Sequence, residues 1–408
     1  MIFAEAASVR LHEIPKNRSV CEVQSLFIIP PCFLHIMQIL QLATALPRNS
    51  RSTEELIKDF PCQLPEAVAQ NVLNLGVKKR FLINQPNANS TTETLMNEIE
   101  LFELCENACQ TAMIKAELCP PDIDYFITAY DANPFLSPGL SQLLAPRLDL
   151  NPFVRHVNAQ GIASTAFTKT LQLAEDYLAK HHEDTVLICV SGASSYWFQN
   201  QVHGFRDVME ISKINSITDT RTRQEELRKW VATMQFFLFG DGIAAAIVSN
   251  KGKGLRVNGI VEVTNVEEKD CMAGYTRLSS TNKPFMFGLN SHLGRQIPDL
   301  GAKYTTLALQ RLFGKEANQK MKTAKKYAVH TGSEKILDTL AEHHAIEKKK
   351  LIESHEVLRE NGNLAGASLP IILHRIMSKN KFETGETVMM LGYGWGFSAS
   401  AGLLEVQG

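Results

Sequence analysis

The stretch that decides the fold is Gln160-Gly161-Ile162-Ala163-Ser164-Thr165-Ala166-Phe167, which joins a short apolar segment (residues 153–157) to a run with helical spacing (168–179). A small residue that enters a helix from a buried strand places its side-chain oxygen at the helix N-terminus. Unpaired amides and the helix dipole favour developing negative charge there, so the position suits a nucleophile. The more common role of Ser164 or Thr165 at such a place is the N-cap of the helix.

Length and composition indicate a large globular protein. The chain has 408 residues, 44% of them hydrophobic, enough for two domain-sized halves or one large duplicated domain. A formal net charge of −1 provides no polyanion-binding signature, so we expect no nucleic acid partner. The eight cysteines show no CxxC pair and no metal-ligand spacing. We therefore expect free thiols, no metal and a reducing, cytoplasmic location.

The first 36 residues are expected to be an N-terminal extension. The apolar stretch 25–44 resembles a membrane span in composition, but Pro30-Pro31 interrupts it, and no secretory charge pattern or cleavage site precedes it. We expect neither a membrane span nor a signal peptide.

From Met37 onward, predicted helices and buried strands alternate. Apolar strands are expected at 39–44, 125–129 and 185–190, with helices opening at Ser52 and spanning 96–117 and 137–148. The glycine-containing turn 251–254 separates an N-terminal half (37–250) from a C-terminal half (251–408) that repeats the alternation. This pattern predicts an α/β protein. The polar stretch 199–231 interrupts it and is typical of a solvated helix or loop.

Three features place polar or glycine residues at ends of predicted elements, where α/β folds put their sites. His330 ends a strand over 327–329, Asn363 precedes a helix over 364–378, and 392–397 is rich in glycine. Taken singly, each has an ordinary explanation: a core or surface histidine, an asparagine in a turn, and glycines in a tight turn. Their combination points to a site.

The order and context of these features resemble the thiolase-superfamily condensing enzymes, most closely type III polyketide synthases of the chalcone synthase kind, and also 3-oxoacyl carrier-protein synthase III. The resemblance runs from about Met37 to the end. It is carried by blocks in the family's order: 44–47, 52–57, 76–81, 239–242, 329–332 with 336–338, 357–358 with 362–363, and 392–397. It implies a five-layered αβαβα sandwich of two similar halves, a homodimer, and no cofactor beyond a thioester donor.

The family uses a Cys-His-Asn triad, in which cysteine takes the acyl group from coenzyme A or a carrier protein. The resemblance assigns the histidine to His330 and the asparagine to Asn363, and ungapped counting between 154–155 and 173–176 puts the nucleophile at Ser164. It also implies that the substrate contacts Phe239, Gly394, Trp395 and Gly396. Serine is far less acidic than cysteine, so Ser164 requires His330 as a general base. Whether this serine is native or replaces a cysteine stays open.

Two further departures concern the donor and the cavity. The positions where plant synthases carry basic residues for coenzyme A fall on Ala67, Gln70 and Asn74, so a carrier protein or other basic residues are expected to take that role. The segment 199–231 is longer than its family counterpart and either reshapes the pocket or is a solvated insertion. Trp395 either narrows the cavity or merely packs.

Two functions follow as hypotheses. The first is a cytoplasmic acyltransferase or condensing enzyme of polyketide or fatty-acyl type, in which Ser164 accepts an acyl group from a thioester and passes it to an acceptor. The second is a catalytically inactive partner subunit in a heteromer with an active paralogue. Replacement of the cysteine favours the second hypothesis, whereas retention of His330 and Asn363 favours the first.

Overall fold

The computed structural model describes residues 37–83, 98–133, 135, 137–202, 204–265, 267–278 and 289–408, so the extension predicted over 1–36 lies outside the described residues. Among the described helices, none combines the length and apolar composition needed to cross a membrane. As predicted, Ser52 opens a helix: it caps α1 (Thr53–Lys58) in a reciprocal capping box with Glu55.

Five strands of the N-terminal half lie side by side. Their order is β1 (Gln38–Ala45), β7 (Asp241–Ser249), β6 (Thr185–Ala193), β4 (Tyr125–Tyr130) and β5 (Arg155–Gln160). β7 runs antiparallel to both β1 and β6, whereas β4 is parallel to β6 and β5. The apolar runs predicted as strands form the centre of this sheet because both of its faces are covered.

The C-terminal half repeats this arrangement. β8 (Leu255–Thr264), β13 (Ser398–Val406), β12 (Thr387–Gly394) and β11 (Lys326–Val329) follow one another, with β13 antiparallel to both neighbours and β11 parallel to β12. β8 therefore corresponds to β1, β13 to β7, β12 to β6 and β11 to β4. A short β1–β8 pairing joins the two sets into one nine-stranded ladder.

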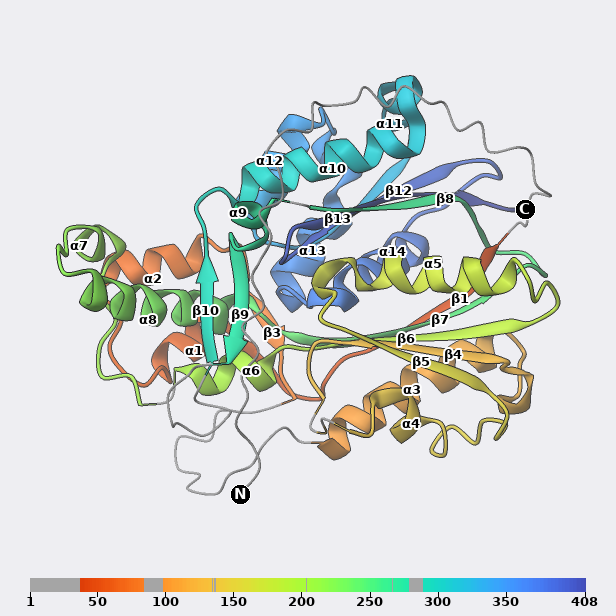
Figure 1. The fold of residues 1–408 in the computed structure, drawn as a ribbon, viewed down its shortest axis with the longest axis horizontal. Helices are drawn as coiled ribbons and strands as arrows, with labels where there is room; N and C mark the ends of the chain where they lie inside the picture. Colours follow the sequence, from red (N-terminus) through yellow and green to blue (C-terminus); the bar gives the residue numbers. More distant parts are fainter. Residues whose placement is uncertain are drawn as a thin grey trace, which may run out of the picture. The chain divides into compact units, whose positions relative to one another are not determined.

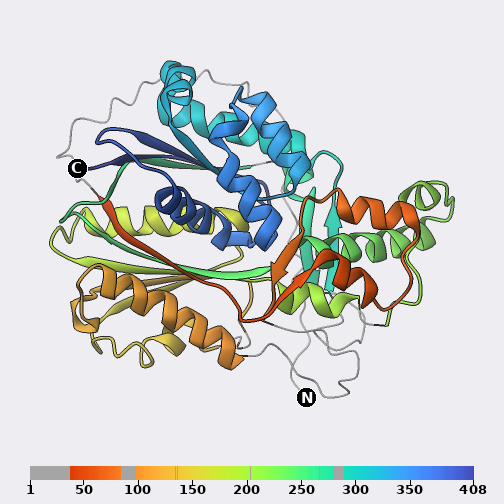
Figure 2. The ribbon, with the colours of Figure 1, turned by 180° about the vertical axis from the view of Figure 1, so that it is seen from behind.

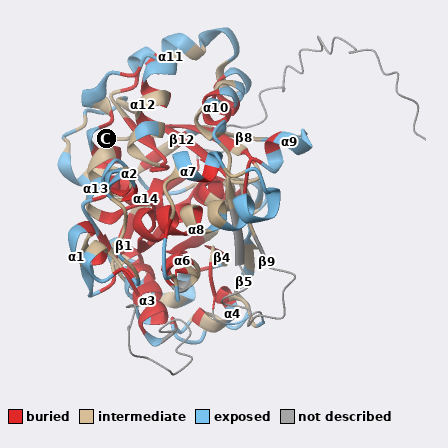
Figure 3. Ribbon diagram, turned by 90° about the vertical axis from the view of Figure 1, so that its left-hand side faces the viewer, coloured by how far each residue is buried: buried red, intermediate tan, exposed pale blue. Residues whose placement is uncertain are grey.

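Helices fill and flank the two sets of strands. Figures 1 and 2 show α5 (Ala166–Leu178) and α14 (Ser368–Lys379) between them, α3 (Glu98–Lys115) against the N-terminal strands, and α10 (Ile297–Phe313) with α12 (Glu334–His343) against the C-terminal strands. Figure 3 shows α14 mostly buried. The predicted five-layered αβαβα architecture is confirmed.

The remaining described α-helices and strands connect these layers or form a lobe beside them. They are β2 (Ser50–Ser52), α2 (Glu66–Leu73), β3 (Lys79–Phe81), α4 (Leu140–Leu144), α6 (Ser195–Gln201), α7 (Ile211–Asn215), α8 (Thr220–Leu238), α9 (Glu268–Cys271), β9 (Gly274–Leu278), β10 (Leu289–Leu293), α11 (Ala317–Thr323) and α13 (Ile352–Asn361). The lobe, called the α8 lobe below, has a core built by α1, α2 and α8.

Two local predictions are corrected. The apolar segment 153–157 is not a strand throughout, because Phe153 is 90% exposed and β5 starts at Arg155. The stretch 199–231 is not simply solvated: the first turns of α8 are exposed, but Val202 and Val208 are buried in a lobe core shared with α1 and α2, and Val231 is buried as well.

Candidate active site

A cavity of about 880 Å³ opens where the two halves meet the α8 lobe. Its lining includes every residue that the sequence put forward for the site: Ser164, Phe239, His330, Asn363, Gly394, Trp395 and Gly396. Segments that are far apart in the chain therefore contribute to a single cavity.

Ser164 sits in a sharp turn between β5 and α5. The turn is a short 3-10 segment, Ala163–Thr165, entered through left-handed backbone at Gly161 (φ +77°) and Ala163 (φ +54°). Among the described residues, neither Ile162 nor Thr165, the cap positions of this turn and of α5, makes a side-chain capping bond. Thr165 does occupy the N-cap position of α5, as the N-cap interpretation allowed, but its hydroxyl donates to the Ile162 carbonyl at 3.2 Å instead of capping the helix. Ser164 is 8% exposed and lines the cavity.

The glycine-rich end of β12 approaches this turn closely. A Cβ atom added to Gly394 would lie 3.0 Å from the backbone nitrogen of Ser164 and 3.2 Å from the Cβ of Ala163. Glycine was expected to permit a close backbone approach, and the neighbour that requires it is the Ser164 turn. The end of β12 therefore packs directly against the main chain that enters Ser164.

His330 follows directly after β11. Its backbone N–H donates to the Leu391 carbonyl at 3.0 Å, which continues the β11–β12 ladder, and its ring meets the Tyr393 ring edge to face at 5.2 Å. The side chain is buried, and Nδ1 has no hydrogen-bond partner among the described residues. Burial lowers the pKa of His330 to about 3. The imidazole is therefore neutral at physiological pH and can accept a proton.

Asn363 is held by three hydrogen bonds. Its backbone N–H donates to the Leu238 carbonyl at 3.0 Å, and its carbonyl accepts from Gly240 N–H at 3.1 Å. Its side-chain Oδ1 accepts from the N–H of Ala365 at 2.9 Å. Because the oxygen is engaged with the backbone, the NH₂ group is the part of this amide left to donate toward the cavity that Asn363 lines.

Aromatic residues form the apolar wall. Phe239 lies 4.4 Å from Phe198 between ring centroids, and Trp395 meets both rings edge to face at 6.3 Å. Trp395 thus both packs and lines the cavity. Trp230 and Met234 of α8 complete this wall, so the segment that interrupts the family pattern contributes to the pocket.

Sequence reasoning missed several lining residues. Asp131 and Ser194 follow the ends of β4 and β6, and Arg295 and Lys335 bring positive charge to the cavity. The available signal for Asp131 was its position: a polar residue at the end of an apolar strand, as with His330.

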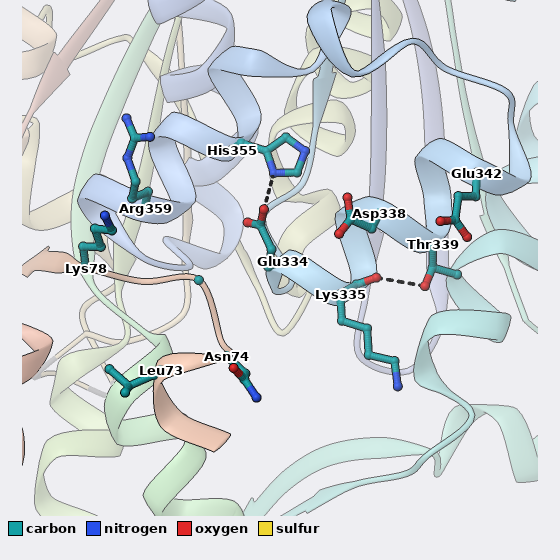
Figure 4. A pocket seen from close by; sticks show the side chains of 11 residues that line it. Leu73, Asn74, Lys78, Glu334, Lys335, Asp338, Thr339, Glu342, His355 and Arg359 are labelled. Carbon is teal, nitrogen blue, oxygen red and sulfur yellow. Dashed lines mark hydrogen bonds and ion pairs between the residues drawn. The ribbon is translucent and has the colours of Figure 1, made fainter. Parts of the chain in front are cut away.

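Lys335 also lines a neighbouring surface groove, shown in Figure 4. The groove holds Lys78 and Arg359 as further cations, whereas Nδ1 of His355 pairs with Glu334 at 3.0 Å. Of the three positions matched to coenzyme A binding in plant synthases, Asn74 reaches this groove.

The fold, and the convergence of Ser164, His330 and Asn363 on one cavity, point to a class of protein. Residues 315–406 match the family described as the C-terminal part of 3-oxoacyl-[acyl-carrier-protein] synthase III. The crystal structure of 1,3,6,8-tetrahydroxynaphthalene synthase from Streptomyces coelicolor, a bacterial type III polyketide synthase, superposes with a TM-score of 0.74 at 22% identity, over 91% of this chain and 99% of that one. In fold and in sequence the chain is similar to the thiolase-superfamily condensing enzymes.

Particular relatives agree with this class. 1,3,6,8-Tetrahydroxynaphthalene synthase of Streptomyces coelicolor is 24% identical over 377 residues, which cover 88% of this chain and 90% of the relative. Beta-ketoacyl-[acyl-carrier-protein] synthase III of Clostridium tetani is 20% identical over 306 residues, which cover 74% of this chain and 83% of the relative.

Proposed function

We propose that this chain transfers an acyl group from a thioester to Ser164 and then to an acceptor. The observation that carries this proposal is the convergence of Ser164, His330 and Asn363 on one cavity from three separate segments. Similarity to enzymes named as synthases supports catalysis over the alternative of an inactive partner subunit.

The residues have distinct roles in the first step. The Ser164 hydroxyl attacks the thioester carbonyl while neutral His330 takes its proton. The NH₂ group of Asn363 and the backbone amides near Ser164 and Gly394 stabilise the oxyanion. When the carbon–sulfur bond breaks, the imidazolium returns the proton to the thiolate. The products are an acyl ester on Ser164 and a free thiol.

The charged end of the donor requires cations at the cavity mouth. Lys335 joins the cavity to the surface groove, and Arg295 lines the cavity itself. These two residues replace the basic positions that are missing at Ala67, Gln70 and Asn74. Coenzyme A and a phosphopantetheine carrier share the phosphate that such cations bind. We expect a homodimer, as in the resemblance.

Intact-protein mass spectrometry tests the proposal. The purified chain is incubated with acyl-coenzyme A donors of increasing length and with acyl carrier protein, and is compared with Ser164→Ala and Ser164→Cys. We expect a mass increase of one acyl group that disappears completely in Ser164→Ala. Labelling of Ser164→Cys alone would show a site built for cysteine, and no label on any form would favour the inactive-subunit alternative.

A further inference from the structure

A second ionisable group faces the cavity from the N-terminal half. Asp131 follows the last residue of β4 and shares the cavity lining with Ser164, Gln160 and Gly161. The triad assigned to acylation leaves this carboxyl group without a role.

The surroundings of Asp131 are those of a positioned carboxyl group. The Ser194 hydroxyl donates to Oδ2 at 3.2 Å, and the indole Nε1–H of Trp197 donates to the Asp131 carbonyl at 3.2 Å. Burial raises the pKa of Asp131 to about 7, and the charge of nearby Asp241 adds to the shift. A group with a pKa near neutrality is suited to accept and return a proton.

The duplicated fold places Asp131 at the position that corresponds to His330 in the other half. In the β4–β6 ladder Tyr130 is level with Ser191, and in the β11–β12 ladder Val329 is level with Leu391. The next residue is Asp131 in one half and His330 in the other, and both line the same cavity. The two proton-transfer groups thus enter it from equivalent strand ends.

Building on the proposed acyl transfer, we propose that Asp131 is the catalytic base for the acceptor, and that the acceptor is an alcohol or amine. In this step the acceptor oxygen or nitrogen forms a bond to the acyl carbon while its proton passes to the Asp131 carboxylate. The bond from that carbon to Ser164 Oγ then breaks, and Oγ takes up the proton from the carboxylic acid. Atoms and charge balance without an oxidant or further reactant.

The same carboxylate disfavours decarboxylative chain extension. A malonyl extender brings its own carboxylate into a cavity that already holds the Asp131 carboxyl group, and two like charges close together repel. The acyl ester on Ser164 is also a poorer donor for carbon–carbon bond formation than a thioester. Both features favour transfer to a heteroatom.

The experiment separates the two half-reactions. The acyl-enzyme is formed with hexanoyl-coenzyme A, freed of donor, and exposed to benzyl alcohol, benzylamine or hydroxylamine while loss of the acyl mass is followed. Hydroxylamine attacks esters without a base, so it reports an intact acyl-enzyme. The variants are Asp131→Asn, which keeps the shape, and Asp131→Glu, which keeps the carboxylate; thermal melting checks their folding.

We expect the parent enzyme to transfer to the alcohol or the amine, and the more reactive probe identifies the acceptor class. Asp131→Asn should slow that transfer at least 30-fold, with hydroxylamine cleavage within threefold of the parent and partial recovery in Asp131→Glu. Equal losses with all nucleophiles, an unchanged rate, transfer to neither probe, or condensation with malonyl-coenzyme A would overturn the inference. Failure of the proposed function is distinguishable, because no acyl group would then form on Ser164.

Discussion

The two central turns of the duplicated fold have the same backbone and different chemistry. Ala163 begins the turn before α5 at φ +54°, and Ala365 begins the turn before α14 at φ +46°. The position after each alanine is Ser164 in one half and Gly366 in the other. A Cβ atom on Gly366 would lie 2.8 Å from the Ala166 Cβ, so only one half has room for a side chain there. The two halves therefore have similar turns, but close packing between them leaves room for a side chain at this position in only one half.

The strand ends differ in a complementary way. In the N-terminal half β4 is followed by acidic Asp131, and in the C-terminal half β11 is followed by basic His330. Burial moves their pKa values in opposite directions, to about 7 and about 3, because it disfavours the charged form of each group. At neutral pH the cavity therefore contains one neutral imidazole and one carboxyl group near its titration point.

The largest expected effect comes from removing the C-terminal base. His330→Gln should lower the rate of Ser164 acylation by about 10³-fold, within the range known for general bases. In the parent, acylation should show no histidine inflection between pH 5 and 8, because the imidazole stays neutral there. Stopped-flow measurement of thiol release gives both the acylation rate of the variant and the pH dependence of acylation in the parent. Acylation that falls as strongly in Asp131→Asn would contradict the division of roles between the two strand ends.

A matched pair of glycines tests the packing between the halves. A Cβ atom on Gly192 would lie 2.0 Å from the Leu364 carbonyl oxygen, whereas one on Gly392 would first meet the Ser400 hydroxyl at 2.6 Å. The backbone has less freedom to move than a side chain. Gly192→Ala should therefore lower the free energy of unfolding by about 3 kcal/mol and Gly392→Ala by about 1 kcal/mol. Urea unfolding compares them, and equal losses would contradict the asymmetry.

Much of this architecture could be predicted from sequence. The apolar runs that became β1, β4 and β6 and the capping signal at Ser52 are local patterns, and the structure confirms them. The prediction of an apolar strand from Phe153 onward was wrong because composition does not distinguish an exposed aromatic residue from a buried one. Burial of Val231 was missed because the charged start of α8 masked its apolar end.

The site was predictable only in part, for a physical reason. His330, Asn363 and Ser164 emerged from a resemblance to a family, because no local spacing connects residues so far apart. Asp131 emerged from neither source: its relation to His330 depends on the registers of two parallel strand pairs, which exist only once both ladders have formed. The equivalence of two residues in duplicated halves can therefore be recognised from the fold, although the sequence alone does not reveal it.

The smallest expected effect is an opposite pH dependence of stability at the two strand ends. Between pH 3 and 6.5 the unfolded chain binds a proton at His330 that the folded chain does not, so this residue makes stability fall as pH falls. Between pH 3.8 and 7 the folded chain binds a proton at Asp131 that the unfolded chain does not, so this residue makes stability fall as pH rises.

The two contributions oppose each other where their ranges overlap, and single variants should expose each of them. Relative to the parent, His330→Gln should make the slope of unfolding free energy against pH more negative between pH 4.5 and 6, by about 1 kcal/mol per pH unit, and Asp131→Asn should make it more positive by a similar amount. Urea unfolding at half-unit pH steps measures both slopes. Slopes that shift in the same direction in both variants would contradict this account. Burial disfavours the charged form of each group, and since one group is a cation and the other an anion, their contributions to the slope must have opposite signs.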